Sequence, residues 1–146
     1  MHTLDLLCFD EPFRFDLRSM RAFAMEPGAI SLVVEIEATM VGFAVVSVQR
    51  RRAGVAAYVN TIDVHPDYRR LGLARMLLTE SERRAARGGA TEISLHVHTG
   101  NVQAVRFYEA CGYVRLGRVD QYYGRGVDAW VYARTLVPSG HTQDLR

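Results

Sequence analysis

The spacing of apolar positions changes along this chain, and each spacing predicts one kind of element. Runs rich in valine, isoleucine and alanine, several of them alternating with polar residues, predict strands at 30–37, 41–49, 55–64, 91–98, 113–119 and 129–136. Apolar residues three or four positions apart predict helices at 73–87 and about 102–111, with two shorter ones at 4–10 and 16–25. Residues 37–39 are typical of a hairpin turn between the first two strands.

This order of elements predicts a mixed α/β fold with a largely antiparallel sheet. Leu73, Met76 and Leu77 share one face of the third helix, and its charged residues mostly lie on other faces. A length of 146 residues suits one domain, which we place at 1–137, followed by a loose polar tail at 138–146.

Composition narrows the class of protein. The chain is 49% hydrophobic and 23% charged, as soluble globular domains are, and its net charge of +2 argues against a nucleic-acid partner. No apolar run is long enough for a membrane span, and the first residues lack the features of a secretion signal. The two cysteines, Cys8 and Cys111, form no paired motif, so we expect a cytoplasmic protein.

The stretch 62–74 turns from an apolar strand into a basic, glycine-containing turn that opens a helix. Glycine lets the main chain approach a ligand, and the first N–H groups of a helix have no internal partners. Arg69, Arg70 and Arg75 add positive potential to the helix dipole. The turn therefore predicts a phosphate site, although a glycine after a strand often makes only a turn.

A second pattern runs from Asn101 to Tyr113, with Ala104, Tyr108 and Cys111 on one helical face. Helical aromatics usually fill the core, which is the simpler interpretation of Tyr108. The alternative places its phenol at a reaction centre, where the O–H group donates a proton.

Taken together, the two patterns resemble the GNAT superfamily of N-acetyltransferases. Residues 69–74 are similar to its Q/R-x-x-G-x-G/A signature, and residues 101–113 to its later N-x-x-A-x-x-F/L-Y-x-x-x-G-F/Y signature. The resemblance implies the GNAT acyl-CoA N-acyltransferase fold, a twisted, mostly antiparallel sheet flanked by helices. Its first strand is expected to be short or missing here, because the chain opens almost directly in the helix predicted at 4–10. A neighbouring chain is one possible source of that strand, and the protein is expected to be a monomer or a homodimer.

The resemblance also implies an acetyl-CoA site. Pantetheine would lie along the third strand, the turn and first helical residues would hold the pyrophosphate, and a later loop would add one contact. The residues implied are Ile62, Asp63, Val64, Arg69, Arg70, Leu71, Gly72, Leu73, Ala74, Arg75 and Asn101, with Tyr108 touching the cofactor as the general acid for the departing thiolate.

The branch of the superfamily that looks closest is that of the bacterial ribosomal-protein N-terminal (alanine) acetyltransferases. Its members carry a glutamate as proton acceptor where this chain has His96, which can take a proton near neutral pH. The alternative is a histidine that is only hydrogen-bonded beside the site. His96 and His98 on one strand face lack a third ligand, so no metal is expected.

The segment 121–129 resembles the loop that covers the peptide in these enzymes. It implies that Tyr122 and Tyr123 contact the substrate, with Phe13 on the opposite wall. The simpler interpretation is a hairpin whose aromatics pack for stability. We therefore expect direct acetyl transfer from acetyl-CoA to a primary amine in a ternary complex, with a protein or peptide N-terminus as first choice. The alternatives are a small-molecule amine acetyltransferase and a non-catalytic acyl-CoA-binding module.

Overall fold

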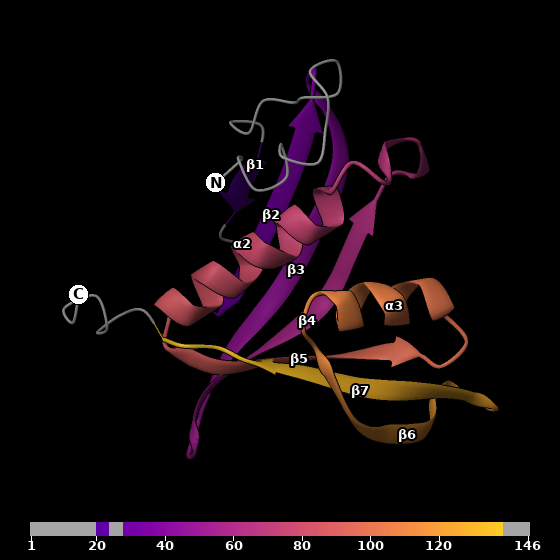
Figure 1. The fold of residues 1–146 in the computed structure, drawn as a ribbon. Coiled ribbons are helices and arrows are strands. Elements are labelled where there is room, and N and C mark those ends of the chain that lie inside the picture. The colour runs from indigo at the N-terminus through magenta and orange to yellow at the C-terminus, as the bar shows by residue number, and fades with distance from the viewer. Residues whose placement is uncertain (1–19, 24–27, 139–146) are drawn as a thin grey trace.

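Among the residues that the structure describes, seven strands form one central sheet in the order β1-β2-β3-β4-β5-β7-β6 (Figure 1). The computed structural model describes residues 20–23 and 28–138. Its elements are β1 (Met20–Phe23), β2 (Ala29–Ile36), β3 (Thr39–Arg51), β4 (Gly54–Val64), the 3-10 turn η3 (Pro66–Tyr68), α2 (Leu73–Arg87), β5 (Ala90–His98), α3 (Val102–Ala110), β6 (Val114–Gly124) and β7 (Val127–Thr135).

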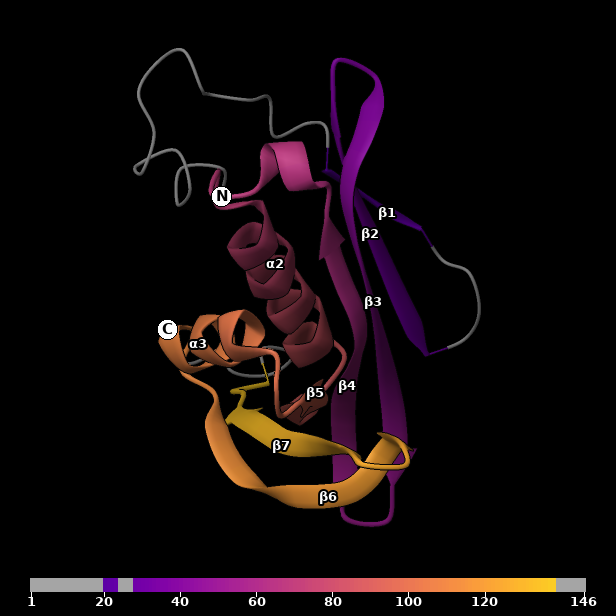
Figure 2. The ribbon, with the colours of Figure 1, turned by 90° about the vertical axis from the view of Figure 1, so that its right-hand side faces the viewer.

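Helices α2 and α3 lie on the same side of the sheet (Figure 2). Leu73 and Leu77 of α2 are fully buried against alternate residues of β2 and β3, such as Leu32, Val34 and Ala44. The period-two pattern of these strands thus gives the sheet one apolar face, and the predicted apolar face of α2 covers it. No helix in the described part of the chain is long and apolar enough to cross a bilayer.

The feature that creates the site is the separation of β4 from β5. These two strands are the only parallel neighbours in the described sheet, and their pairing runs from Val55 opposite Ala90 to Tyr58 opposite Ser94, where it ends. Beyond that point β4 continues to Val64 on β3, while β5 turns away with β7 (Figure 1). The backbone of β4 after Tyr58 therefore has no strand beside it on that edge.

The mixed, mostly antiparallel fold predicted from the sequence is confirmed, including the hairpin at Glu37–Ala38, whose two residues have positive φ. The predicted helix at 16–25 is wrong for Met20–Phe23, which form the short edge strand β1. Pairing with Ser31–Val34 of β2 fixes this segment, and such a ladder overrides weak local propensity. The predicted helix at 4–10 and the tail after Pro138 lie outside the described residues.

Two further features differ from the sequence-based prediction. β6 extends to Gly124, five residues beyond the predicted end at 119, because a two-residue turn at 125–126 returns the chain directly into β7. Glu82 of α2 is buried, where its carboxylate accepts hydrogen bonds from the Tyr113 hydroxyl at 2.7 Å and from Arg134 at 2.9 Å. This acid therefore ties α2 to the start of β6 and to β7.

Candidate active site

The turn between β4 and α2 presents unpaired backbone N–H groups. Arg70 and Gly72 both have positive φ, +68° and +80°, which turns the chain sharply before the helix. The first helical bond runs from the Met76 N–H to the Gly72 carbonyl at 3.0 Å. Within the described part of the chain, the amides of residues 70–75 have no hydrogen-bond acceptor. With the helix dipole behind them, they form a site suited to an anion.

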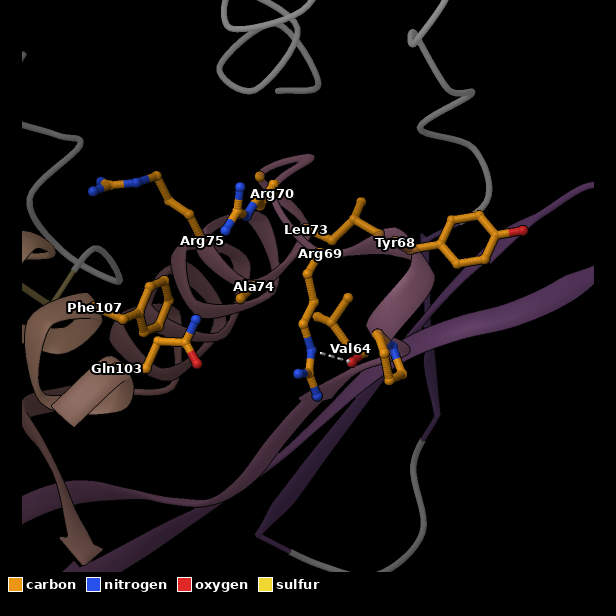
Figure 3. A pocket seen from close by; sticks show the side chains of 11 residues that line it. Val64, Tyr68, Arg69, Arg70, Leu73, Ala74, Arg75, Gln103 and Phe107 are labelled. Carbon is orange, nitrogen blue, oxygen red and sulfur yellow. Dashed lines mark hydrogen bonds between the residues drawn. The ribbon is translucent and has the colours of Figure 1, made fainter. Parts of the chain in front are cut away.

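A cavity of about 580 Å³ opens in front of these amides. Figure 3 shows Gln103 and Phe107 of α3 on one side of it and Arg69 on the other. The Arg69 Nε donates to the Val64 carbonyl at 3.1 Å, so this side chain folds back over the end of β4. Arg75 also lines the cavity and reaches the Ala110 carbonyl at 3.4 Å. The cavity is therefore positively charged on the side of the turn.

An adjoining cavity of about 310 Å³ continues along β4. It shares five lining residues with the first cavity and brings together segments that are far apart in the sequence. Its lining residues are Ile62, Asp63, Val64, Arg69, Ala74, Asn101, Gln103, Ala104, Phe107 and Tyr108. The β4 residues, Asn101 and Tyr108, assigned to one site by resemblance, thus line a cavity that adjoins the cavity of the turn.

Asn101 has a structural role as well as a place in the cavity wall. Its Oδ1 accepts the Ala104 N–H at 3.1 Å and so caps α3. This bond uses only the carbonyl oxygen of the side-chain amide. The Nδ2 group is the part of Asn101 that can donate to a ligand.

Tyr108 is packed between Phe107 and Tyr113, whose rings meet it edge-on at centroid distances of 5.0 and 5.7 Å. Burial, followed by the nearby groups of Cys111, Tyr123 and Asp63, raises the pKa of its phenol to about 12. The phenol is therefore protonated at neutral pH. At the end of the cavity along β4, it can donate a hydrogen bond or a proton.

The opposite face of the sheet carries a second titratable group at the same gap. His96 alternates with the buried residues Leu95 and Val97, so it points away from the helices. Its Nδ1 lies 2.7 Å from the hydroxyl of Tyr58, which comes from β4. The Tyr122 ring stacks in parallel on the imidazole with centroids 4.1 Å apart, and its hydroxyl lies 3.3 Å from that of Tyr58.

The pKa values of His96 and Tyr58 shift in opposite directions, and both shifts favour the neutral side chain. Burial lowers the pKa of His96, so the imidazole is neutral near pH 7. Burial and the Tyr122 hydroxyl raise the pKa of Tyr58, which keeps its proton. The Tyr123 phenol raises the pKa of both Tyr58 and Tyr108, so it lies within electrostatic reach of both sides of the gap. A neutral imidazole bonded to a phenol can receive a proton and pass it on.

The sequence analysis did not identify Tyr58. Its neighbours Ala57 and Val59 are buried, so strand alternation places Tyr58 on the polar face. That it lies beside His96 depends on the register of β4 and β5, which no local pattern reveals. Phe13 lies outside the described residues. Among the residues that are described, no group of three or more histidine, cysteine or acidic side chains is arranged to hold a metal.

The model of the acetyltransferase (GNAT) family matches residues 1–113. The N-alpha-acetyltransferase RimI of Mycobacterium tuberculosis is 37% identical over 97 residues, which are 66% of this chain and 60% of that protein. N-alpha-acetyltransferase 30 of Schizosaccharomyces pombe is 33% identical over 82 residues, 56% of this chain and 55% of that protein. The chain thus spans a little over half the length of each of these two relatives.

Solved structures show the same fold. The ribosomal-protein-S18-alanine N-acetyltransferase of Escherichia coli superposes with a TM-score of 0.66 and 24% identity, covering 85% of each chain. Arabidopsis thaliana NAA60 in complex with acetyl-CoA superposes with a TM-score of 0.66 and 19% identity, covering 75% of this chain and 77% of that one.

Proposed function

Because this chain belongs to the acetyltransferase (GNAT) family, we propose that it transfers the acetyl group of acetyl-CoA to the α-amine of a protein or peptide N-terminus. The membership confirms the resemblance drawn from residues 69–74 and 101–113. The observation that carries the proposal is the pair of adjoining cavities that extend from the unpaired amides of α2 along β4 to the Tyr108 phenol.

The described residues offer contacts suited to the pyrophosphate and to the pantetheine of acetyl-CoA. The amides of residues 70–75, with Arg69 and Arg75 beside them, are suited to the pyrophosphate. The edge of β4 at Ile62 and Asp63, which has no neighbouring strand, offers backbone groups to the amides of pantetheine. The Nδ2 of Asn101 adds a donor from the other wall. When bound, acetyl-CoA supplies the thioester from which the acetyl group leaves.

We assign Tyr108 to the leaving-group side of the reaction. Its phenol keeps its proton and lines the cavity at the end away from the charged turn. There it can donate to the negative charge that develops on the sulfur as the acyl bond breaks. Cys111, the single cysteine among the described residues, is buried, and burial raises the pKa of its thiol. This disfavours the thiolate that an acyl-enzyme route needs, so direct attack by the amine is the simpler mechanism.

We assign His96 and Tyr58 together to the amine side. The amine must lose a proton as it attacks, and the neutral imidazole can accept it, directly or through the Tyr58 hydroxyl. His96 was predicted alone as the proton acceptor that replaces the glutamate. The contact with Tyr58 supports that hypothesis and extends it to a pair. It also argues against a non-catalytic acyl-CoA-binding module, which has no need of a proton acceptor beside the gap.

The choice of an α-amine rests on acidity and on the relatives. An α-ammonium group has a pKa of about 8, against about 10.4 for a lysine side chain, so a neutral imidazole suffices to deprotonate it near pH 7. Several curated relatives are N-alpha-acetyltransferases by name, including those from M. tuberculosis and S. pombe. Tyr122 and Tyr123 stand beside the histidine on the open face, where they are half-exposed and can contact a peptide.

The test is turnover by the purified chain with acetyl-CoA and peptides that begin with alanine, serine or methionine. Release of free CoA thiol gives the rate, and mass spectrometry locates the acetyl group. We expect acetylation of the α-amine, and peptides blocked at the N-terminus but containing lysine serve as the matched control. If the chain acetylates a polyamine or an amino acid but no peptide, its substrate is a small amine and not a protein N-terminus. Binding of acetyl-CoA without turnover of any amine would leave only a binding module.

A further inference from the structure

The hairpin of β6 and β7 is irregular just where it reaches the active site. Val119 pairs with Ala129, and Gly124 pairs with Val127, so residues 120–123 of β6 lie opposite Asp128 alone. Within this bulge Gln121 has a φ of +54°, a conformation that residues other than glycine rarely adopt. Bulges beside active sites commonly redirect side chains, and a strained one persists only if its surroundings hold it.

The Asp128 side chain supplies that restraint. Its Oδ1 accepts the backbone N–H of Gln121 at 2.7 Å, and its Oδ2 accepts Nη2 of Arg118 at 2.5 Å. Its backbone carbonyl accepts the N–H of Thr99 at 3.0 Å, in the loop that leads to Asn101. Asp128 of β7 thus holds both β6 and the loop before Asn101. The Gln121 N–H, followed by Arg118, lowers the pKa of this carboxyl group, which is ionised at neutral pH.

The bulge determines where the two tyrosines of β6 stand. One residue after Gln121, the Tyr122 ring lies parallel to the His96 imidazole, and its hydroxyl approaches that of Tyr58. The next residue, Tyr123, meets His98 edge-on at a centroid distance of 6.1 Å. A regular ladder has a period of two, so it would send neighbouring tyrosines to opposite faces of the sheet. The observed arrangement brings both to the face of the histidines.

We propose that Asp128 is a positioning residue whose carboxylate fixes the Gln121 bulge and so holds Tyr122 against His96 and Tyr58. This inference rests on the proposed function, because the site that it completes is the one assigned to the amine. The two cavities assigned to acetyl-CoA are lined, among the described residues, by none from β6 or β7. Loss of Asp128 should therefore disturb the amine side of the reaction and leave cofactor binding intact.

The experiment compares Asp128→Ala and Asp128→Asn with a matched control, Asp120→Asn. Asp120 also pairs with Arg118, at 3.2 Å, but its side chain is 77% exposed, and it makes no contact with the Gln121 amide within the described residues. For Asp128→Ala we expect the KM of the peptide to rise at least fivefold and the Kd of acetyl-CoA to stay within twofold. Asp128→Asn keeps an oxygen for the Gln121 N–H, so it should recover most of the lost affinity. Asp120→Asn should match the wild type.

A second measurement tests the position of the tyrosine without relying on activity. The ring current of Tyr122 shifts the imidazole Hε1 resonance of His96, which can be assigned by its loss in His96→Gln. In Asp128→Ala this resonance should move toward that of an unstacked histidine, and in Asp120→Asn it should not move. If the wild type acetylates no peptide, the proposed function fails, and the resonance still decides whether Asp128 holds the bulge.

Three results would overturn the inference. The first is an unmoved His96 resonance with an unchanged peptide KM in Asp128→Ala. The second is an equal effect from Asp120→Asn, which would indicate general electrostatics around Arg118. The third is a parallel loss of acetyl-CoA affinity, which would indicate a wider structural role. If Asp128→Ala fails to fold, as judged by its thermal unfolding, the same three criteria apply to Asp128→Asn and Asp128→Glu.

Discussion

Replacement of Tyr108 by phenylalanine tests whether its phenol transfers a proton or only stabilises charge. The pKa of this phenol is raised to about 12, whereas that of an ordinary thiol is about 8.5. The two pKa values differ by about 3.5, so complete transfer of the proton from the phenol to a free thiolate costs about 5 kcal/mol of free energy. Such a cost makes full transfer unfavourable before the thiolate departs. A hydrogen bond from the phenol to the developing negative charge remains favourable.

The expected effect follows from the strength of such a bond. Hydrogen bonds to charged groups contribute about 1.5–3 kcal/mol, so Tyr108→Phe should lower kcat by about 10- to 150-fold. The KM of acetyl-CoA should change little, because the phenol is used mainly as charge develops. Stopped assays of thiol release over a range of acetyl-CoA concentrations measure both parameters.

Tyr113→Phe is the matched control for this substitution. It removes the hydroxyl of the neighbouring tyrosine, which donates to the buried Glu82 at 2.7 Å and lines neither cavity among the described residues. This variant should lose about 1.5–3 kcal/mol of stability, because the bond is to a buried carboxylate, with kcat unchanged. A loss below threefold in Tyr108→Phe would show that its phenol only packs. A loss beyond about 10⁴-fold would show that proton transfer is obligatory, and the reasoning from its pKa would be wrong.

Three other predictions concern single residues. Tyr58→Phe removes the hydroxyl beside His96 and should lower kcat with a peptide by at least tenfold. Calorimetry should find an unchanged affinity for acetyl-CoA. An unchanged kcat would exclude a proton relay through Tyr58. Gly72→Val places a β-branched residue at φ +80°, so it should abolish detectable acetyl-CoA binding and lower the melting temperature. The folded-state pKa of His96 lies below its unfolded value of about 6.5, so the unfolded chain binds the proton more readily. Urea unfolding should therefore show that the free energy of unfolding falls from pH 7 toward pH 5 more steeply in the wild type than in His96→Gln. Equal slopes of this free energy against pH would contradict the burial of the imidazole.

The sequence predicted those parts of the fold whose patterns are local. Local periodicity identifies the strands at 30–37 and 91–98 and the helix at 73–87. The glycine before α2 likewise identifies the turn that leads into this helix. The two motifs at 69–74 and 101–113, taken together, then identified the family from the sequence. In these cases, local propensity and tertiary packing favour the same structure.

The errors and omissions arise where distant segments decide the outcome. Residues 20–23 had a helical pattern, yet they pair with β2 as a strand. Tyr58 was overlooked because its partner His96 lies 38 residues away, across a parallel pair whose register is set by the α2 crossover. The bulge at Gln121 depends on the side chain of Asp128, seven residues later, so a short loop was expected where β6 continues.

The separation of β4 from β5 places the two groups of the proposed mechanism, Tyr108 and His96, at the same gap in the sheet. Where their pairing stops after Tyr58 and Ser94, the helix side of the gap is lined by Tyr108 and the other face by His96. Burial acts on both, and it favours the neutral form in each case. The pKa of the Tyr108 phenol therefore rises, which keeps its O–H as a hydrogen-bond donor, and the pKa of the His96 imidazole falls, which keeps a nitrogen lone pair free to accept a proton. In the mechanism proposed above, the same partial exclusion of water would thus prepare a hydrogen-bond donor for the leaving sulfur and a proton acceptor for the amine, without a carboxylate base. Burial would raise the pKa of a glutamate at position 96, which makes its carboxylate a stronger base but also favours the protonated form. A hydrogen bond from the Tyr58 hydroxyl would stabilise the carboxylate. His96→Glu should therefore retain activity only when that hydroxyl is present. Comparison of His96→Glu with the double variant His96→Glu, Tyr58→Phe in the peptide assay tests this, and equal rates in the two would show that Tyr58 does not support the base.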